Sequence, residues 1–263
     1  MSVDFALILV LATVVTGVIW AVDALLFRRQ RLREAAQSGI DEPVRDPVIV
    51  DYARSFFPII LIVLIVRSFL FEPFRIPSSS MMPTLIIGDF IFVNKYVYGL
   101  RLPVVNNLVV PVGQPRRGDV VVFRLPSDPK TNFIKRVVGL PGDRIRYYNK
   151  QLFVNDEPVK VDVDGMYTGP GSADARVGIE RLGDVEHEVL VQLHGYSPDG
   201  EYRVPPDHYF VMGDNRGNSH DSRYADVGYI PAENLVGKAV MIWMNWDWTG
   251  KAPVWSRIGD TIR

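Results

Sequence analysis

The strongest constraint on this chain lies near its N-terminus, where a long segment carries no charged residue. The segment reads FALILVLATVVTGVIWAV and lies between Asp4 and Asp23. A helix rises about 1.5 Å per residue, so the segment nearly crosses a hydrocarbon layer of about 30 Å. No Lys or Arg precedes it, which argues against a cleaved export signal, because such signals begin with basic residues. We therefore predict a transmembrane helix within residues 1–27, after a short N-terminal tail.

A second apolar segment predicts a second span at residues 55–71. It reads SFFPIILIVLIVRSFLF and lies between Arg54 and Glu72. Arg67 interrupts it near the far end, where a long basic side chain can reach the membrane surface. Pro58 falls in the first turn of the expected helix, a position that tolerates proline.

The basic residues around these spans predict their orientation. Four arginines, at positions 28, 29, 31 and 33, follow the first span, and the N-terminal tail has no basic side chain. By the positive-inside rule, the linker at residues 28–54 is cytoplasmic. Both termini, and the whole chain from Glu72 onward, then lie on the extracytoplasmic side.

The extracytoplasmic part reads as a mainly β domain. Segments such as DFIFVNKYVYG, GDVVVFRLP and DHYFVMGD are rich in Val, Ile, Phe and Tyr, and Gly-Asp and Pro-Gly-Asp turns separate them. We expect this domain to comprise residues 72–160 and 205–263. Residues 161–204 are more polar and Gly-rich, which predicts an insertion or a small subdomain.

Composition excludes several kinds of chemistry. The chain has no cysteine, so thiolate catalysis, disulfides and zinc–thiolate sites are ruled out. Its formal net charge of −1 argues against a general nucleic-acid-binding protein. None of the four histidines has the spacing of a metal-binding pair. We predict that the protein uses no metal and no cofactor.

A serine-rich segment, PSSSMMPTL at residues 77–85, is the candidate source of a nucleophile. A loop that leaves a membrane helix would also be rich in Ser and Pro. A serine hydroxyl becomes a nucleophile only beside a base. The segment is therefore a catalytic candidate, and not simply a loop, only if another part of the chain supplies that base. His220 and Asp221 look like two thirds of a catalytic triad, but neighbours on a strand point to opposite faces.

Lysine is the other available base, provided that burial lowers its pKa. Most lysines here lie in polar turns, but Lys135 lies within the apolar segment NFIKRVVGL. Strand alternation puts Phe133, Lys135 and Val137 on one face. The alternation alone does not say which face is buried.

Several long blocks together resemble bacterial type I signal peptidases, the membrane-anchored serine proteases that remove signal peptides from exported proteins. Two N-terminal spans precede PFRIPSSSMMPTLIIGDFIFVNKYVYG, then RRGDVVVFRLPSDPKTNFIKRVVGLPGD, then VMGDNRGNSHDSR. The resemblance covers nearly the whole chain. It implies a signal-peptidase-like β-fold for the extracytoplasmic catalytic domain, with two N-terminal transmembrane helices.

The resemblance also implies roles for individual residues. Ser80 matches the nucleophile and Lys135 the general base of a Ser/Lys dyad. Ser78 matches the position whose hydroxyl helps to form the oxyanion hole, together with the Ser80 backbone N–H. Ser219 matches the residue that orients the lysine amine. The charged residues that match supporting positions are Arg136, Asp214, Asp221 and Arg223.

The family's substrates carry small residues at positions −1 and −3 from the cut, often Ala-x-Ala. The resemblance implies a shallow apolar pocket for them, and the alternative role of each lining residue is ordinary core. An extended substrate would pair along strand edges. The matching residues are Phe74, Ile76, Pro77, Met81, Leu85, Phe133 and Ile134.

The implied partners are signal peptides of secreted preproteins, the lipid bilayer and the secretion translocon, with no nucleic acid. The implied location is the bacterial inner (cytoplasmic) membrane, as a multi-pass protein with its catalytic domain on the periplasmic side. Trp243, Trp246 and Trp248 could lie at the membrane interface or in the core. Gly217 departs from the family pattern, which usually has Asp there.

Three alternatives stay open at this point. A repressor-cleaving Ser/Lys autoprotease would need a DNA-binding module and no membrane spans. A membrane-tethered binding module or chaperone would work without Ser80 and Lys135. A processing peptidase for one dedicated substrate would carry the same motifs.

Overall fold

The computed structural model describes residues 5–38, 46–103, 107–169, 174–192, 194, 197–248 and 250–263. The chain divides into two compact units. Met1–Leu70 and Arg101–Asn107 form the first unit, and Phe71–Leu100 and Leu108–Arg263 form the second. The predicted spans fall in the first unit and the predicted β domain in the second.

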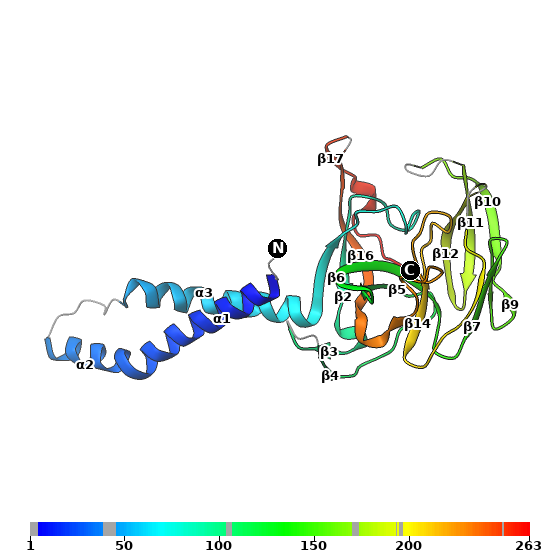
Figure 1. Cartoon of the computed structure of the whole chain (residues 1–263). Coiled ribbons are helices and arrows are strands. Elements are labelled where there is room, and N and C mark those ends of the chain that lie inside the picture. The colour runs from blue at the N-terminus through cyan, green and yellow to red at the C-terminus, as the bar shows by residue number, and fades with distance from the viewer. Residues whose placement is uncertain are drawn as a thin grey trace. The chain divides into compact units, whose positions relative to one another are not determined.

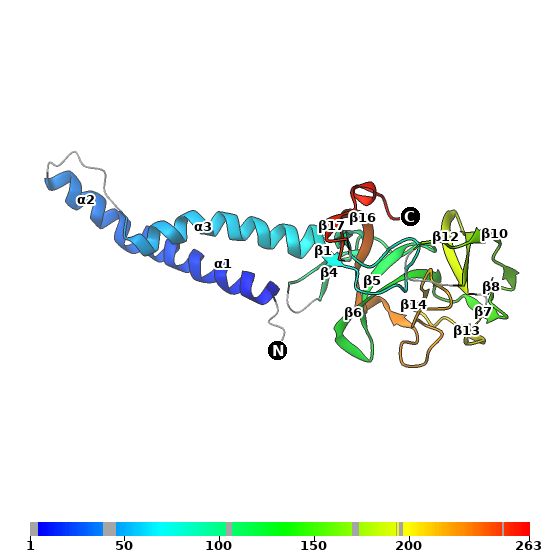
Figure 2. The ribbon, with the colours of Figure 1, turned by 90° about the horizontal axis from the view of Figure 1, so that it is seen from above.

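The first unit is helical. Helices α1 and α3 run side by side, as both Figure 1 and Figure 2 show. Gly17 makes this close packing possible, because a Cβ there would lie 2.8 Å from Cε2 of Phe57. The Phe57 ring also packs against Trp20, with ring centroids 5.5 Å apart. The helices are α1 (Phe5–Val22), α2 (Arg28–Ser38) and α3 (Val48–Ile65), with π-helical turns at Asp23–Phe27 and Val66–Leu70.

Two helical stretches, Phe5–Glu34 and Val48–Leu70, are long and apolar enough to cross a membrane. Almost none of their residues is buried within the protein, unlike a core helix of a soluble domain. Both stretches reach into the predicted linker at 28–54, so much of that linker is helical. Pro58 therefore lies in the interior of α3 and not in its first turn, because the helix begins at Val48.

The second unit is built around an eight-stranded sheet in the part of the chain that the structure describes. Its order is β1-β2-β16-β5-β6-β14-β15, and β17 pairs with β16. The central strand β5 is buried on both faces over Val120–Phe123, which explains its unbroken run of Val and Phe. The strands are β1 (Phe71–Arg75), β2 (Asp89–Asn94), β5 (Val120–Leu125), β6 (Asp128–Gly139), β14 (His208–Met212), β15 (Ile230–Pro231), β16 (Leu235–Asp247) and β17 (Ala252–Pro253).

Smaller sheets complete the unit, and one of them includes a strand from the C-terminal end of the predicted insertion. Strand β13 lies within residues 161–204 but pairs with β7, which lies outside them. The last strand of the predicted insertion, β13, therefore belongs to the same sheet as β7, which precedes the insertion. These strands are β7 (Arg144–Tyr148), β8 (Gln151–Val154), β9 (Glu157–Pro158) and β13 (Gly200–Arg203); β3 (Leu100–Arg101) and β4 (Leu108–Val110) form a further short pair.

The remainder of the predicted insertion forms a three-stranded antiparallel sheet, which we call the inserted sheet. It consists of β10 (Val161–Met166), β11 (Ala175–Leu182) and β12 (Val185–Gln192). Its strands stand together in Figure 1. Strand β10 is the outer strand, mostly exposed, and its register shifts between Val163 and Gly165.

Candidate active site

The three serines lie in a closed loop between β1 and β2. The N–H of Ile76 donates to the carbonyl of Asp89 at 2.8 Å, and the N–H of Gly88 donates to the carbonyl of Ile76 at 3.1 Å. Gly88 has a φ of +99°, and a Cβ there would lie 2.4 Å from the Trp246 carbonyl oxygen. Only glycine satisfies both requirements, so the loop that carries Ser80 is fixed at its base.

Strand β6 supplies Lys135. In the β5–β6 ladder Lys135 pairs with Val121, which is fully buried. The strand is exposed at its start and buried on both faces from Lys135 onward. Alternation along the strand puts Phe133, Lys135 and Val137 on one face, but it does not separate a buried face from an exposed one, because both faces are enclosed at this end. Lys135 is only 4% exposed.

Folding brings these two residues together across the chain. Lys135 Nζ lies 2.8 Å from Ser80 Oγ, within hydrogen-bond distance. The same nitrogen donates to the carbonyl of Ile134 at 2.9 Å. Ser80 is 9% exposed, so the pair sits at the edge of the core and remains reachable from solvent.

Burial changes the acidity of this lysine. Removal from water lowers the pKa of Lys135 from its ordinary value near 10.5 to about 8. The charges of Asp221 and Asp214 act in the opposite direction but are outweighed. About a tenth of the amine is therefore neutral at pH 7 and able to accept a proton.

The other two sequence-predicted polar residues lie close by. Ser78 is exposed, and its Oγ lies 3.4 Å from Ser80 Oγ. Ser219 is buried, and its Oγ makes no hydrogen bond with any described residue, Lys135 included. Its hydroxyl nevertheless lies near enough to Asp221 to help to lower the pKa of that carboxyl.

Two buried ion pairs surround the dyad. Arg136 donates from Nε and Nη2 to both carboxylate oxygens of Asp214, at 2.8 and 2.7 Å. Arg223 binds Asp221 in the same two-pronged way, at 2.8 and 2.9 Å. Burial alone would raise the pKa of each carboxyl, but the facing arginine more than offsets it, so both pKa values lie below the ordinary range. Both carboxylates stay charged at neutral pH.

The structure separates His220 from Asp221. The His220 Nε2 lies 2.7 Å from Asp226 Oδ2 on the exposed surface, whereas Asp221 is buried with Arg223. These two neighbours do not form the first two links of a triad. In the described part of the chain, no group of three or more His, Asp or Glu is placed to hold a metal ion.

The seven residues matched to a substrate pocket divide by exposure. Ile76, Met81 and Leu85 are buried in one hydrophobic cluster, so they serve as core beneath the site. The others are accessible at least in part: Pro77 is exposed, and Phe74, Phe133 and Ile134 are partly buried. Trp243 packs in an aromatic group with Phe90 and Phe92, whereas Trp248 is 54% exposed.

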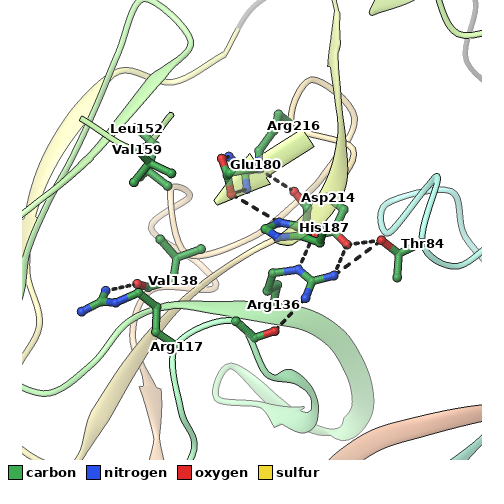
Figure 3. Close-up of polar contacts among 12 residues, drawn as sticks. Thr84, Arg117, Arg136, Val138, Leu152, Val159, Glu180, His187, Asp214 and Arg216 are labelled. Atoms are coloured by element: carbon green, nitrogen blue, oxygen red, sulfur yellow. Dashed lines mark hydrogen bonds and ion pairs between the residues drawn. The ribbon is translucent and has the colours of Figure 1, made fainter. Parts of the chain in front are cut away.

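Sequence reasoning missed a buried polar cluster beside the dyad (Figure 3). Arg216 donates from Nη1 to Glu180 Oε1 at 2.6 Å and from Nη2 to Glu180 Oε2. His187 Nε2 lies 3.3 Å from Glu180 Oε2 and 3.7 Å from Asp214 Oδ1. Thr84 donates to the other oxygen of Asp214 at 2.5 Å. No local pattern could have revealed these contacts, because they join distant segments.

Gly217, where the resemblance led us to expect Asp, packs against β12. A Cβ at this position would lie 2.7 Å from Gln192 Oε1 and 2.8 Å from Gln192 Cβ. A side chain at residue 217 would therefore require Gln192 to move. The glycine and the glutamine fit together as a pair.

Comparison with known proteins identifies the family. The family described as "Signal peptidase, peptidase S26" matches residues 49–246. Two relatives named signal peptidase I are similar over 98% of this chain and 99% of their own lengths: one from Pseudomonas fluorescens at 47% identity and one from Pseudomonas aeruginosa at 45%. A solved signal peptidase I from Enterococcus faecalis V583 aligns with 48% of this chain and 96% of its own at 26% identity, with a TM-score of 0.30, too low to support a comparison of the folds.

The chain belongs to the signal peptidase family, peptidase S26. It is therefore a serine-type hydrolase that cleaves signal peptides, and the predictions of the family, the mainly β fold and the enzyme class are confirmed. Membership in the signal peptidase family also decides against a binding module and against a repressor-cleaving autoprotease. The two apolar helices agree with a membrane-anchored enzyme.

Proposed function

We propose that Ser80 is the nucleophile of this signal peptidase and that the neutral amine of Lys135 is its general base. The observation that carries the proposal is the 2.8 Å separation of Lys135 Nζ and Ser80 Oγ, for a lysine whose pKa burial lowers to about 8. A base is most effective when its pKa lies near the working pH. Lysine with an ordinary pKa would be almost entirely protonated and unable to act.

The proposed reaction has two halves. Ser80 Oγ attacks the scissile carbonyl carbon while its proton moves to Lys135 Nζ; the C–N bond then breaks, and the ammonium returns the proton to the leaving amine. Lys135 next removes a proton from water, which attacks the ester, and the proton returns to Ser80 Oγ as the signal peptide leaves with a free carboxylate. Every proton is returned, so the dyad is restored without a cofactor.

The oxyanion would be bound by the Ser80 N–H and the Ser78 hydroxyl. The Ser80 N–H has no acceptor among the described residues, and Ser78 is exposed at 3.4 Å from the attacking oxygen. Both donors are therefore available to a carbonyl that approaches Ser80. The supporting role of Ser219 and of the two ion pairs, Arg136–Asp214 and Arg223–Asp221, is to keep the dyad dry and in place.

The substrate would bind as an added strand. Strand β14 pairs with β6 only from Arg136 onward, so the edge of β6 around Phe133 and Ile134 is open in the described part of the chain. Strand β1, which leads into the serine loop, is the terminal strand of the same sheet. Main-chain pairing at these edges, with Phe74 and Ile134 beside small side chains at −1 and −3, suits an Ala-x-Ala type segment.

We further propose a periplasmic catalytic domain at residues 72–160 and 205–263, with spans at 1–27 and 55–71, a cytoplasmic linker at 28–54, and the insertion at 161–204. The inner membrane, its lipids and the secretion translocon are the proposed surroundings. Because the chain has no cysteine, single substitutions test the topology cleanly. In spheroplasts, an impermeant maleimide should label Ser127→Cys but not Gln37→Cys, and the reverse pattern would contradict the orientation.

The catalytic proposal is tested on the full-length protein in detergent, with a preprotein substrate and mass mapping of the cut. Ser80→Ala and Lys135→Ala should each abolish cleavage. The matched controls Ser127→Ala and Lys130→Ala change exposed residues of the same types, and Lys130 lies on the same strand as Lys135. If Ser80→Ala kept normal activity, or if Ser79→Ala abolished it instead, the dyad would be wrong.

A further inference from the structure

We infer that the inserted sheet positions the nucleophile, with Leu190 and Glu180 as positioning residues for Ser80. The inference rests on the proposed function, because it takes Ser80 as the reacting residue. Three separate contacts join this sheet to the serine loop and to the segment that follows β14. Each contact is of a different physical kind.

The first contact is apolar. Leu190 of β12 and Ala175 of β11 form a buried cluster with Met82, which lies two residues after Ser80. All three side chains are 0–2% exposed. Since Met82 is enclosed by the inserted sheet, the turn that follows Ser80 cannot shift without opening this cluster.

The second contact is a backbone bridge that leads to the nucleophile. The Leu190 N–H donates to the Asp214 carbonyl, and the Arg216 N–H donates to the Leu190 carbonyl, both at 2.8 Å. Between them, the Asn215 N–H donates to the Ser80 carbonyl at 3.1 Å, and Asn215 Nδ2 donates to the Ser79 carbonyl at 3.1 Å. Strand β12 thus fixes the backbone on both sides of Asn215, and Asn215 in turn binds the carbonyl of Ser80.

The third contact is ionic (Figure 3). Glu180 and His187 face each other across β11 and β12, and Glu180 binds the guanidinium of Arg216. Burial alone would raise the pKa of Glu180, but Arg216 and His187 lower it to about 2, so the carboxylate remains charged over the working pH range. The inserted sheet therefore anchors Arg216, next to the residue that bonds to Ser80.

The test compares two buried leucines of the inserted sheet. Leu190 packs against Met82, whereas Leu182 packs in a separate cluster with Leu152 and Val159. Both Leu→Ala changes remove the same volume from a core, so both should lower the melting temperature. Only Leu190→Ala should lower kcat, by tenfold or more with KM within twofold, at a temperature where both variants are folded. Leu190→Met, which keeps the volume, should restore most of the activity.

The pH profile separates positioning from simple loss of folded enzyme. A loosened serine loop admits water to Lys135, so Leu190→Ala should shift the rise of kcat/KM to higher pH, which a smaller folded fraction cannot do. Glu180→Gln should lower kcat several-fold, and Glu188→Gln, an exposed carboxylate on the same sheet, should not.

Equal kcat and equal pH profiles for Leu190→Ala and Leu182→Ala would overturn the inference. Ser80→Ala is assayed in parallel to keep the two proposals apart. If Ser80→Ala is inactive while Leu190→Ala and Glu180→Gln behave like their controls, the positioning role alone fails. If Ser80→Ala is active, the proposed function itself fails.

Discussion

The pH dependence of cleavage should report the buried lysine directly. With a pKa of about 8, about a tenth of Lys135 is neutral at pH 7 and about nine tenths at pH 9. We therefore expect kcat/KM to rise about tenfold from pH 7 to pH 9 and then to level off. A lysine with an ordinary pKa of about 10.4 would give a rise of about 100-fold over the same range, with no plateau.

The assay measures initial rates of preprotein cleavage at substrate concentrations below KM, with full-length enzyme in detergent at constant ionic strength. Enzyme held at each pH and returned to pH 8 controls for irreversible denaturation. A midpoint near 6.5 would point to histidine as the base. A rise that continues through pH 9.5 without levelling would mean that Lys135 is not desolvated, and the reasoning from burial would be refuted.

The same shift should appear in stability, with a definite sign. The lysine binds its proton more weakly in the folded state than in the unfolded state, because its pKa is lower in the folded state. The protonated lysine therefore destabilises the fold at every pH below about 8. The cost is about 3 kcal/mol, and it disappears as the pH rises toward about 10.4. The stability of Lys135→Met relative to the unmodified protein should therefore fall by about 3 kcal/mol between pH 7 and pH 10.5. A pH-independent difference would contradict this.

Three further predictions concern the surroundings of the dyad. Ser78→Ala should lower kcat by about 10²–10³ with KM little changed, as measured by steady-state kinetics, because one oxyanion donor is lost. Asp221→Asn should move the rise of kcat/KM to lower pH, since the Asp221 charge opposes the lowered pKa of Lys135, and chemical denaturation should reveal a loss of about 3–5 kcal/mol from the broken buried pair. Gly217→Asp should lower the melting temperature through its clash with Gln192, and adding Gln192→Gly, which also removes the Gln192 Cβ, should recover part of the loss; an unchanged melting temperature in the single variant would contradict the packing argument.

Features with a local cause could be predicted from the sequence. The uncharged segment at Phe5–Val22 is helical with these same bounds, because composition over one span decides it. Lys135 could be singled out because a cation is unusual within an apolar strand. Its distance to Ser80 could not be predicted, since fifty-five positions separate the two residues and only the fold brings them together.

The failures also have physical causes. The prediction that Pro58 lies in a first turn considers only the apolar run after Arg54, whereas α3 extends backward through Asp51 and Arg54 to Val48. Nothing local in the sequence marks Glu180 and Arg216 as buried charges. Their burial depends on each other, because neither ion could be enclosed without its partner.

The outer strand of the inserted sheet has a consequence for an enzyme that works among unfolded chains. Extended polypeptide emerging from a membrane can add to any straight, unpaired strand, and each such capture would compete with productive binding. On β10, the register shift between Val163 and Gly165 interrupts the ladder, and Asp162 and Asp164 add two charges. Strand β10 is therefore a poor template for an incoming chain, and the substrate-binding edge proposed beside Ser80 would meet less competition for the segment that is to be cut.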